Sequence, residues 1–180
     1  MPLWFDVVAA PQRRRPPGKM STLRHFTATG FVVDGGRLLL HWHPKVKAWL
    51  PPGGHIEENE DPAEAVLREI REEAGVSAEI VPTGATFALA YPRCVVPPFT
   101  IMIEDIHDPV DGYHQHIDMI YFCRLAGEGR RLNDGWRWVA AADLAGAAPM
   151  LGGAAEAVPP PEDVRLLARH AFEVVGSATH

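Results

Sequence analysis

The chain has little cysteine: Cys94 and Cys123 are the only two in 180 residues. Two separate thiols form neither a disulfide framework nor a paired set of metal ligands, so the small disulfide-stabilised secreted class is excluded. Apolar runs are short too, and none approaches the ~20 residues of a membrane-spanning helix. The first ten residues are too short and too interrupted for a secretory signal. We therefore expect a cytoplasmic protein with reduced thiols and no membrane partner.

An excess of positive charge is also missing. Aspartate and glutamate number 23 against 17 lysines and arginines, which gives a formal net charge of −6. This balance argues against a surface for non-specific binding of nucleic acid or membranes, and we expect neither partner. It provides no attraction for polyphosphates either, so an anionic substrate would need a bridging metal ion and local cations. The hydrophobic content of 47% is ample for one domain with extensions.

The two ends of the chain differ from its middle. Residues 11–19 are rich in proline and arginine and cannot build a packed element, so residues 1–19 are expected to form a flexible basic extension. An arm that grips substrate or a partner is the alternative, and Met20 is a candidate for the true start. The folded domain is expected over residues 20–146. Residues 147–180 are expected to add a loop and a C-terminal helix packed on the same domain.

The most informative stretch covers residues 54–76, GHIEENEDPAEAVLREIREEAGV. Asp61 can serve as the N-cap of a helix, with Pro62 in the first helical position. Glu64 stands three residues after the cap, which predicts a capping box. Gly75 is expected to end the helix in a left-handed conformation. The sequence therefore predicts a helix over residues 62–74.

Three carboxylates gather on one side of this helix. Glu69, Glu72 and Glu73 stand at positions i, i+3 and i+4, beside an apolar arc of Ala63, Val66, Leu67, Ile70 and Ala74. Repulsion among them costs roughly a few tenths of a kcal/mol per pair in an isolated helix. A hard divalent cation reverses that cost, because Mg²⁺ takes oxygen ligands. Taken alone, such a cluster is also typical of a solvated acidic helix face.

Nine positions of the stretch have the identity and spacing of the Nudix box: Gly54, Glu60, Arg68, Glu69, Ile70, Glu72, Glu73, Gly75 and Val76. The chain thus resembles the Nudix hydrolases, and residues 49–54 (WLPPGG) resemble the usual approach to the box. The resemblance implies an α/β fold, an α/β/α sandwich with a mixed sheet and a catalytic loop-helix-loop. A homodimer is compatible with it.

The activity implied by the resemblance is that of a Mg²⁺-dependent pyrophosphohydrolase, with Mn²⁺ as a substitute. Such an enzyme cleaves a diphosphate linkage in a nucleoside diphosphate derivative, whether a nucleotide, a dinucleotide or a nucleotide sugar, by attack of water on phosphorus. Two other functions stay open on the same fold. One is a non-catalytic module that binds such a ligand and regulates a partner. The other is a prenyl diphosphate isomerase, which would need a cysteine in a recognisable motif.

The resemblance also assigns roles to residues. The metal ligands that it implies are the carbonyl of Gly53 and the carboxylates of Glu57, Glu69, Glu72 and Glu73. Arg68 is expected to orient carboxylates by bidentate contact, and it forms the catalytic set with Glu69, Glu72 and Glu73. Glu60 is expected to brace the loop before the helix. Glu69 is one candidate for the general base, whose position varies in the family.

Candidate substrate contacts lie outside the box, at His43, Lys45, Lys47, Trp49, His116 and Asp118. The first three belong to a loop that carries cations towards the box. In the strand expected over residues 113–125, alternation places His114, His116 and Asp118 on one face, which suggests the wall of a site. A solvated sheet face is the alternative. A separate zinc site formed by His114, His116 and a loop carboxylate is another.

The rest of the chain alternates strand patterns with turns. A close approach or a bulge is expected at Gly30, and a turn over residues 34–36. Strands are expected at 25–33, 37–42, 99–106, 113–125 and 136–139, with interrupted strand material over 78–90. Further helices are expected at 140–145 and 162–175, and a loop over 146–160.

Overall fold

The computed structural model describes residues 22–110, 112–127, 131–152 and 156–178. The basic extension expected over residues 1–19 lies outside these ranges. The strands of the main sheet are β1 (Arg24–Asp34), β2 (Arg37–His43), β3 (Ala48–Leu50), β4 (Gly53–His55), β5 (Ser77–Ile80), β6 (Thr100–Asp108), β7 (Gly112–Ala126) and β8 (Trp136–Ala140). The helices are α1 (Pro62–Glu69), the π-helical stretch η1 (Ile70–Ala74), α2 (Ala141–Ala145) and α3 (Glu162–Ser177).

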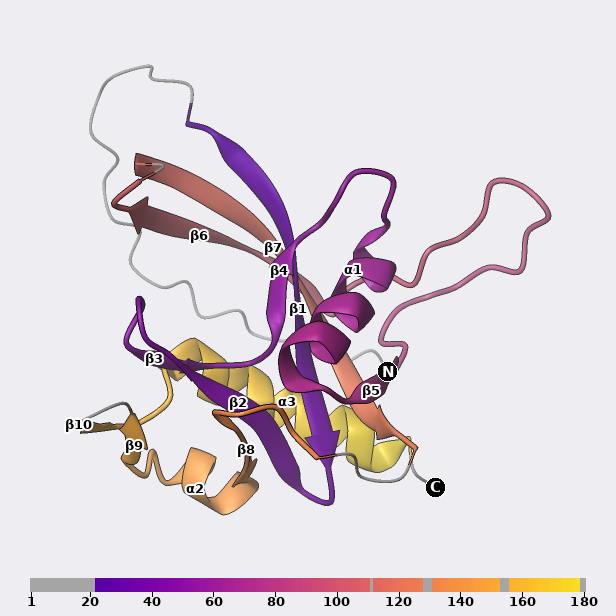
Figure 1. The fold of residues 1–180 in the computed structure, drawn as a ribbon. Coiled ribbons are helices and arrows are strands. Elements are labelled where there is room, and N and C mark those ends of the chain that lie inside the picture. Colours follow the sequence, from indigo (N-terminus) through magenta and orange to yellow (C-terminus); the bar gives the residue numbers. More distant parts are fainter. Residues whose placement is uncertain (1–21, 111, 128–130, 153–155, 179–180) are drawn as a thin grey trace, which may run out of the picture.

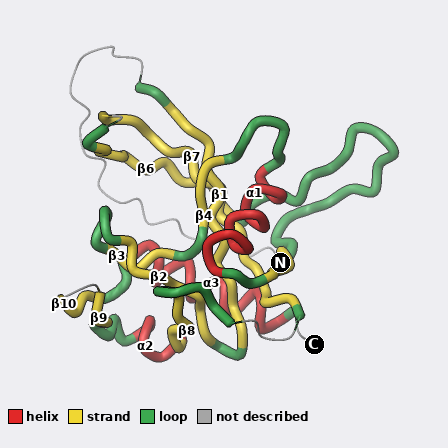
Figure 2. Tube along the Cα trace, in the orientation of Figure 1, coloured by secondary structure: helices red, strands yellow, loops and turns green. Residues whose placement is uncertain are grey.

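The sheet is mixed and lies between two helices (Figures 1 and 2). Strands β1 and β7 run parallel, and every other pairing in the sheet is antiparallel. One hydrophobic cluster joins the sheet to α1 and η1, through residues such as Val66 and Ile70. A second cluster joins the opposite face to α3, through Val164, Leu167 and Ala171. The expected α/β/α sandwich with a mixed sheet is confirmed.

Local sequence signals explain where α1 begins and where its last turn ends. The Asp61 carboxylate accepts from the backbone N–H groups of Ala63 and Glu64, at 2.9 and 3.0 Å. The Glu64 carboxylate accepts in turn from the Asp61 N–H at 2.9 Å, which completes the capping box. Gly75 is left-handed, with φ of 76°. The helical segment therefore spans the expected residues 62–74, although its last turn is π-helical rather than α-helical.

Two glycine positions in β1 and its turn have clear physical reasons. A Cβ on Gly30 would lie 2.7 Å from Cδ1 of Ile70. Glycine at this position therefore lets the box helix, which consists of α1 and η1, approach the sheet closely. Gly35 and Gly36 both have positive φ, at 52° and 73°, and form the two-residue turn of the β1–β2 hairpin. The close approach and the turn expected at these positions are confirmed.

Two segments differ from the expected pattern. Residues 81–99 form a loop that projects from the sheet in Figure 1, so the strand material expected up to residue 90 ends at Ile80. Pro82, two residues after Ile80, has no N–H to give to a sheet ladder, which accounts for the end of the strand. In the loop expected over 146–160, β9 (Met150–Gly152) and β10 (Glu156–Val158) instead form a small hairpin.

Strands β3 and β4, in the approach to the box, were not predicted, and the other elements agree with expectation. Strand β7 is the longest, and α3 covers the sheet with its buried face. Within the described ranges, no helix is long and apolar enough to cross a membrane.

Candidate active site

Arg68, in the last turn of α1, is the centre of a network of hydrogen bonds. Its guanidinium donates to both carboxylate oxygens of Glu60, at 2.8 and 3.0 Å, in a bidentate pair. It also donates to Glu69 at 2.8 Å and to Glu72 at 3.2 Å. A fifth bond reaches the carbonyl of His55 at 3.0 Å. Arg68 therefore fixes two of the three box glutamates and ties their helix to β4.

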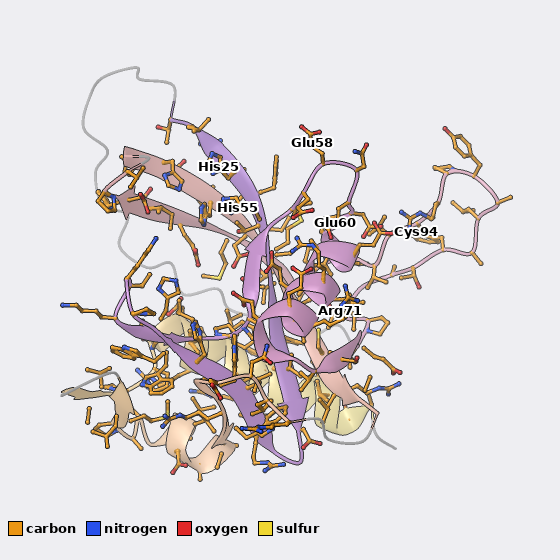
Figure 3. The ribbon with its side chains drawn as sticks, in the orientation of Figure 1. His25, His55, Glu58, Glu60, Arg71 and Cys94 are labelled. Atoms are coloured by element: carbon orange, nitrogen blue, oxygen red, sulfur yellow. The ribbon has the colours of Figure 1, made fainter. Side chains whose placement is uncertain are left out.

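Glu60 braces the loop before the helix. Besides its pair with Arg68, its carboxylate accepts from the backbone N–H of Glu57 at 3.1 Å. The hydrogen bonds from Arg68 hold the pKa of Glu60 below its usual range. Figure 3 shows Glu60 beside α1, while Glu58, two residues earlier, extends from the tip of the loop. The geometry matches the structural role expected for Glu60.

Glu73 lies against the Gly-Gly segment, which is Gly53 and Gly54 of β4. Its carboxylate accepts from the Gly53 N–H at 3.1 Å. Burial raises the pKa of Glu73, the Gly53 hydrogen bond lowers it, and the nearby Glu69 charge raises it further. The two carboxylates are therefore close enough to repel one another. A cation between them would relieve that repulsion.

Gly54 makes room for Glu69. A Cβ at this position would lie 2.5 Å from Oε1 of Glu69, far inside van der Waals contact. At Gly53, a Cβ would meet the Ala28 carbonyl at 2.8 Å and the Thr29 hydroxyl at 2.7 Å. Both glycines thus bring the β4 backbone directly against the helix carboxylates or against β1. Carboxylates packed beside a bare backbone form an oxygen-rich cradle, and this donor set fits a hard divalent cation such as Mg²⁺.

The remaining expected metal ligands are more exposed. The Glu72 side chain is 57% exposed and is held by Arg68 alone among the contacts seen for its carboxylate in the described residues. Glu57 lies in the exposed turn between β4 and α1. These positions leave both carboxylates accessible from solvent. Their role as ligands, and that of the Gly53 carbonyl, stays a prediction.

The substrate contacts expected before the box divide into two groups. Trp49 is fully buried in the core on the α3 side, where its indole N–H donates to the Met150 carbonyl at 3.4 Å. Trp49 is therefore a core residue, and its burial argues against the substrate contact predicted for it. His43, Lys45 and Lys47 lie at the turn between β2 and β3, across β4 from α1 in Figure 1. Their contact with substrate stays a prediction.

Asp118 lies on the α3 side of the sheet. Alternation along β7 puts it on the face of Ile120 and Phe122, which pack into the α3 cluster, whereas Tyr121 packs towards α1. Asp118 is buried and accepts from the Thr27 hydroxyl at 2.9 Å. Its burial excludes the solvated-face alternative at this position. Whether substrate reaches Asp118 stays a prediction.

Burial governs the electrostatics around Asp118. It raises the pKa of Asp118, although hydrogen bonds from Thr29 and Thr27 act in the opposite direction. Glu104 on β6 lies on the same face. Burial, with the charges of Asp118 and Asp163, raises the pKa of Glu104 to about 7. Acidic groups on this face thus ionise less readily than exposed carboxyls.

His116 belongs to a group of four histidines. Its ring lies near those of His25, His55 and His114, with centroids 6.1, 5.0 and 5.1 Å away. Burial and the charges of these neighbours lower the pKa of His116 to about 4. The sequence pattern identified His114 and His116 as a pair. His25 and His55 were missed because only the strand register brings them there.

Asn133 is a further residue at the box that sequence reasoning missed. Its side-chain amide donates to the carbonyls of Glu72 and Glu73, at 3.2 and 2.9 Å. Its backbone N–H donates to the Ala74 carbonyl at 3.1 Å. These bonds satisfy carbonyls at the end of the helix that carries the glutamates. Asn133 lies about sixty residues along the chain, so no local signal reveals it.

Comparisons with known proteins agree with this geometry. A family model described as the NUDIX domain matches residues 23–159. An RNA pyrophosphohydrolase from Halorhodospira halophila is 44% identical over 60 residues, which are 32% of this chain and 33% of that protein. The matched part thus spans one third of the relative's length.

Solved structures show the same fold. A NUDIX-family hydrolase from Clostridium perfringens superposes with a TM-score of 0.65 and 27% identity, over 84% of this chain and 98% of that one. A MutT protein from Bacillus halodurans has a TM-score of 0.52 and 17% identity, over 82% of each chain, which is a similarity of fold alone. Glu69 and Glu73 of the box lie against Gly54 and Gly53, and the family model spans most of the chain, so this chain belongs to the NUDIX domain family.

Proposed function

We propose that this protein is a divalent-metal-dependent pyrophosphohydrolase that cleaves a diphosphate linkage in a nucleoside diphosphate derivative. The observation that carries the proposal is the joint placement of three box carboxylates by Arg68 and the Gly-Gly backbone. Glu69 and Glu72 are held by Arg68, and Glu73 by the Gly53 N–H. Membership of the NUDIX family supports the same reaction class.

The chain's own residues prepare this site before a substrate arrives. Arg68 pairs with Glu60 and donates to Glu69 and Glu72, which restricts the conformations of both carboxylates. Gly54 leaves the space into which Glu69 packs. Glu72, the most exposed of the three, faces solvent and is accessible to an incoming phosphate group.

Glu57, Glu69, Glu72, Glu73 and the Gly53 carbonyl are the groups that would hold Mg²⁺ or Mn²⁺. The cation would neutralise charge on the phosphate oxygens, which the chain's net charge of −6 does not do. His43, Lys45, Lys47 and His116 remain the proposed contacts to the rest of the substrate. We propose a cytoplasmic location, in keeping with reduced Cys94 and Cys123.

The isomerase alternative is disfavoured by the position of the cysteines. Cys123 is fully buried on the α1 side of the core, and burial raises the pKa of its thiol to about 12. A thiol that is both inaccessible and protonated cannot serve as an acid–base partner to a glutamate at the surface. Cys94 lies in the loop after β5, where its Sγ donates to the Val95 carbonyl.

The test is hydrolysis of a substrate panel, with and without Mg²⁺, followed by separation and identification of the nucleotide monophosphate, pyrophosphate or sugar phosphate products. The panel contains oxidised dGTP, ordinary nucleoside triphosphates, ADP-ribose, NADH, diadenosine polyphosphates, nucleotide sugars and prenyl diphosphates. RNA with a 5′ triphosphate is added because of the relative named an RNA pyrophosphohydrolase. We expect turnover of one class that requires the metal and falls on the order of 10²-fold or more in Glu73→Gln.

Glu79→Gln is the matched control. Glu79 is an exposed β5 carboxylate paired with Arg124, away from the box helix, so the same change of charge there should leave turnover intact. If no member of the panel is hydrolysed and one ligand binds tightly by calorimetry, the protein is a non-catalytic binding module and the hydrolase proposal is wrong.

A further inference from the structure

Four histidines from three strands converge at one end of the sheet. His25 lies on β1, His55 ends β4, and His114 and His116 lie on β7. The parallel register places His25 beside His116, and the antiparallel register places His55 beside Thr27, two residues after His25. Because residues two apart on a strand share a face, all four side chains meet on the same side of the sheet. Figure 3 shows His25 and His55 together on the neighbouring strands β1 and β4.

The nitrogen atoms of this cluster are close together. Nδ1 of His25 lies 3.1 Å from Nε2 of His55, and Nε2 of His114 lies 3.3 Å from Nε2 of His116. Ligand nitrogens of His25, His114 and His116 all lie within 4.8 Å of one another. In a tetrahedral zinc site with Zn–N bonds of about 2.0–2.1 Å, neighbouring nitrogens are roughly 3.3 Å apart. Both close pairs therefore already have the spacing of a tetrahedral edge.

One histidine is fixed in the tautomer that a metal needs. Nδ1 of His114 lies 3.2 Å from the Gly112 carbonyl. A carbonyl only accepts, so this nitrogen carries the proton and Nε2 is left with its lone pair. His114 is 4% exposed, and its Nε2 is directed at His116 inside the cluster. Metal-bound histidines are commonly held in this way by a backbone carbonyl.

We propose that His25, His114 and His116, with His55 beside His25 as the fourth ligand, form a binding site for a divalent transition metal of the Zn²⁺ type, distinct from the carboxylate site of the box. Neutral imidazole nitrogens select Zn²⁺, Cu²⁺ or Ni²⁺ and disfavour Mg²⁺, which prefers oxygen. The site links β1, β4 and β7. It also adjoins the box, because the backbone carbonyl of His55 is bound by Arg68.

The experiment measures zinc bound to the full chain after removal of metals with a chelator. Titration calorimetry and elemental analysis should give one tight Zn²⁺ per chain, and Co²⁺ should give the absorption bands of tetrahedral nitrogen coordination. Bound zinc should raise the melting temperature by about 5 °C when it is well above its dissociation constant. His114→Ala with His116→Ala should weaken binding by at least ~100-fold.

Two further variants locate the metal. His170→Gln, on α3 and outside the cluster, should retain zinc, and Glu73→Gln should also retain it while losing Mg²⁺-dependent turnover. His55→Gln changes an exposed residue, so it serves if the double variant does not fold. The proposal is overturned if zinc binding is absent, survives in folded histidine variants, or is lost in Glu73→Gln. In those cases the cluster is held by imidazole–imidazole hydrogen bonds alone or the zinc occupies the carboxylates. None of these outcomes depends on the pyrophosphohydrolase activity.

Discussion

At the scale of single residues, Arg68 combines more functions than any other side chain of the box. It pairs with Glu60, orients Glu69 and Glu72, and binds the His55 carbonyl. Its side chain and that of Glu60 are only 16% and 14% exposed, so their charges are poorly solvated and depend on each other. The carboxylates raise the pKa of Arg68 above its ordinary value, which keeps it charged at any working pH.

Arg68→Lys tests this role. Lysine retains the charge but lacks the planar guanidinium group. It therefore cannot make the bidentate pair with Glu60 and also donate to Glu69 and Glu72. We expect turnover to fall on the order of 10²-fold and the free energy of unfolding to fall by about 1–3 kcal/mol. Arg71→Lys is the control, because Arg71 is exposed on the same helical segment and points outward in Figure 3. Equal effects of the two substitutions on turnover would contradict the role of Arg68.

Glu104 gives a prediction about pH. Burial raises its pKa to about 7 in the folded protein, above the usual value of 4.5 in an unfolded chain. The folded state therefore binds the proton more tightly, and this contribution to stability is present below pH ~4.5 and lost as pH rises through about 7. Glu104→Gln removes the titration. The free energy of unfolding of Glu104→Gln, relative to that of the wild type, should therefore increase between pH 5 and pH 8.

The measurement is urea unfolding of both proteins at pH 5 and pH 8, with a chelator present to exclude metal binding. Between the two pH values, we expect the difference in free energy of unfolding between Glu104→Gln and the wild type to increase by about 1–2 kcal/mol in favour of the variant. The difference between the proteins reports the titration of Glu104 together with its charge coupling to Asp118 and Asp163. A gain that is the same at pH 5 and pH 8 would show that the carboxyl has an ordinary pKa.

At the scale of elements, the box helix is defined at both ends by short-range signals. Its start is fixed by Asp61 and Glu64, and its end by Gly75, as their spacing predicts. Asn133, which binds the last carbonyls, comes from a distant segment and has no such signal. The π-helical last turn was not expected, because five residues of helix-forming sequence do not specify which hydrogen-bond register they adopt.

Asp61→Ala tests the N-terminal cap. The substitution removes the acceptor for two backbone N–H groups and also the ion pair with Arg93 at 2.7 Å. We expect the free energy of unfolding to fall by about 1–2 kcal/mol. Asp34→Ala, which removes an exposed ion pair from the β1–β2 hairpin, should cost less than about 1 kcal/mol. Chemical unfolding of both variants compares them, and equal losses would mean that the cap does not stabilise the helix.

At the scale of the whole molecule, α3 closes the face of the sheet that α1 leaves uncovered. Its buried residues include Val164, Leu167, Ala168, Ala171 and Val175, which join the larger hydrophobic cluster. Helix α3 thus packs on the sheet, and the assignment of residues 147–180 to the same domain stays a prediction. This face also carries Asp118 and Glu104, and Asp163 at the start of α3 is one of the charges that act on Glu104.

Adjacent leucines on α3 provide a matched test. Leu167 is 8% exposed and Leu166 is 49% exposed. Leu167→Ala should lower the free energy of unfolding by about 2–4 kcal/mol through lost burial and a cavity, whereas Leu166→Ala should change it by less than about 1 kcal/mol. Thermal or urea unfolding distinguishes them. Similar losses would mean that α3 does not pack on the sheet through this face.

The sequence by itself determined the box, its caps and most of the strands. These features depend on contacts within a few residues, such as the capping box at Asp61 or the hairpin turn at Gly35 and Gly36. The nine box positions also carried enough chemistry to identify the carboxylate site. Local spacing specifies such features because the hydrogen bonds involved close within one turn of chain.

Only the tertiary structure decided which distant residues meet. The burial of Trp49, the placement of Asp118 on the α3 face and the meeting of four histidines all follow from strand register. Register is set by the packing of both sheet faces at once, and no short segment contains that information. The sequence therefore determined the box residues proposed for the carboxylate site, whereas the histidine cluster exists only because the parallel pairing of β1 with β7 aligns His25 and His116.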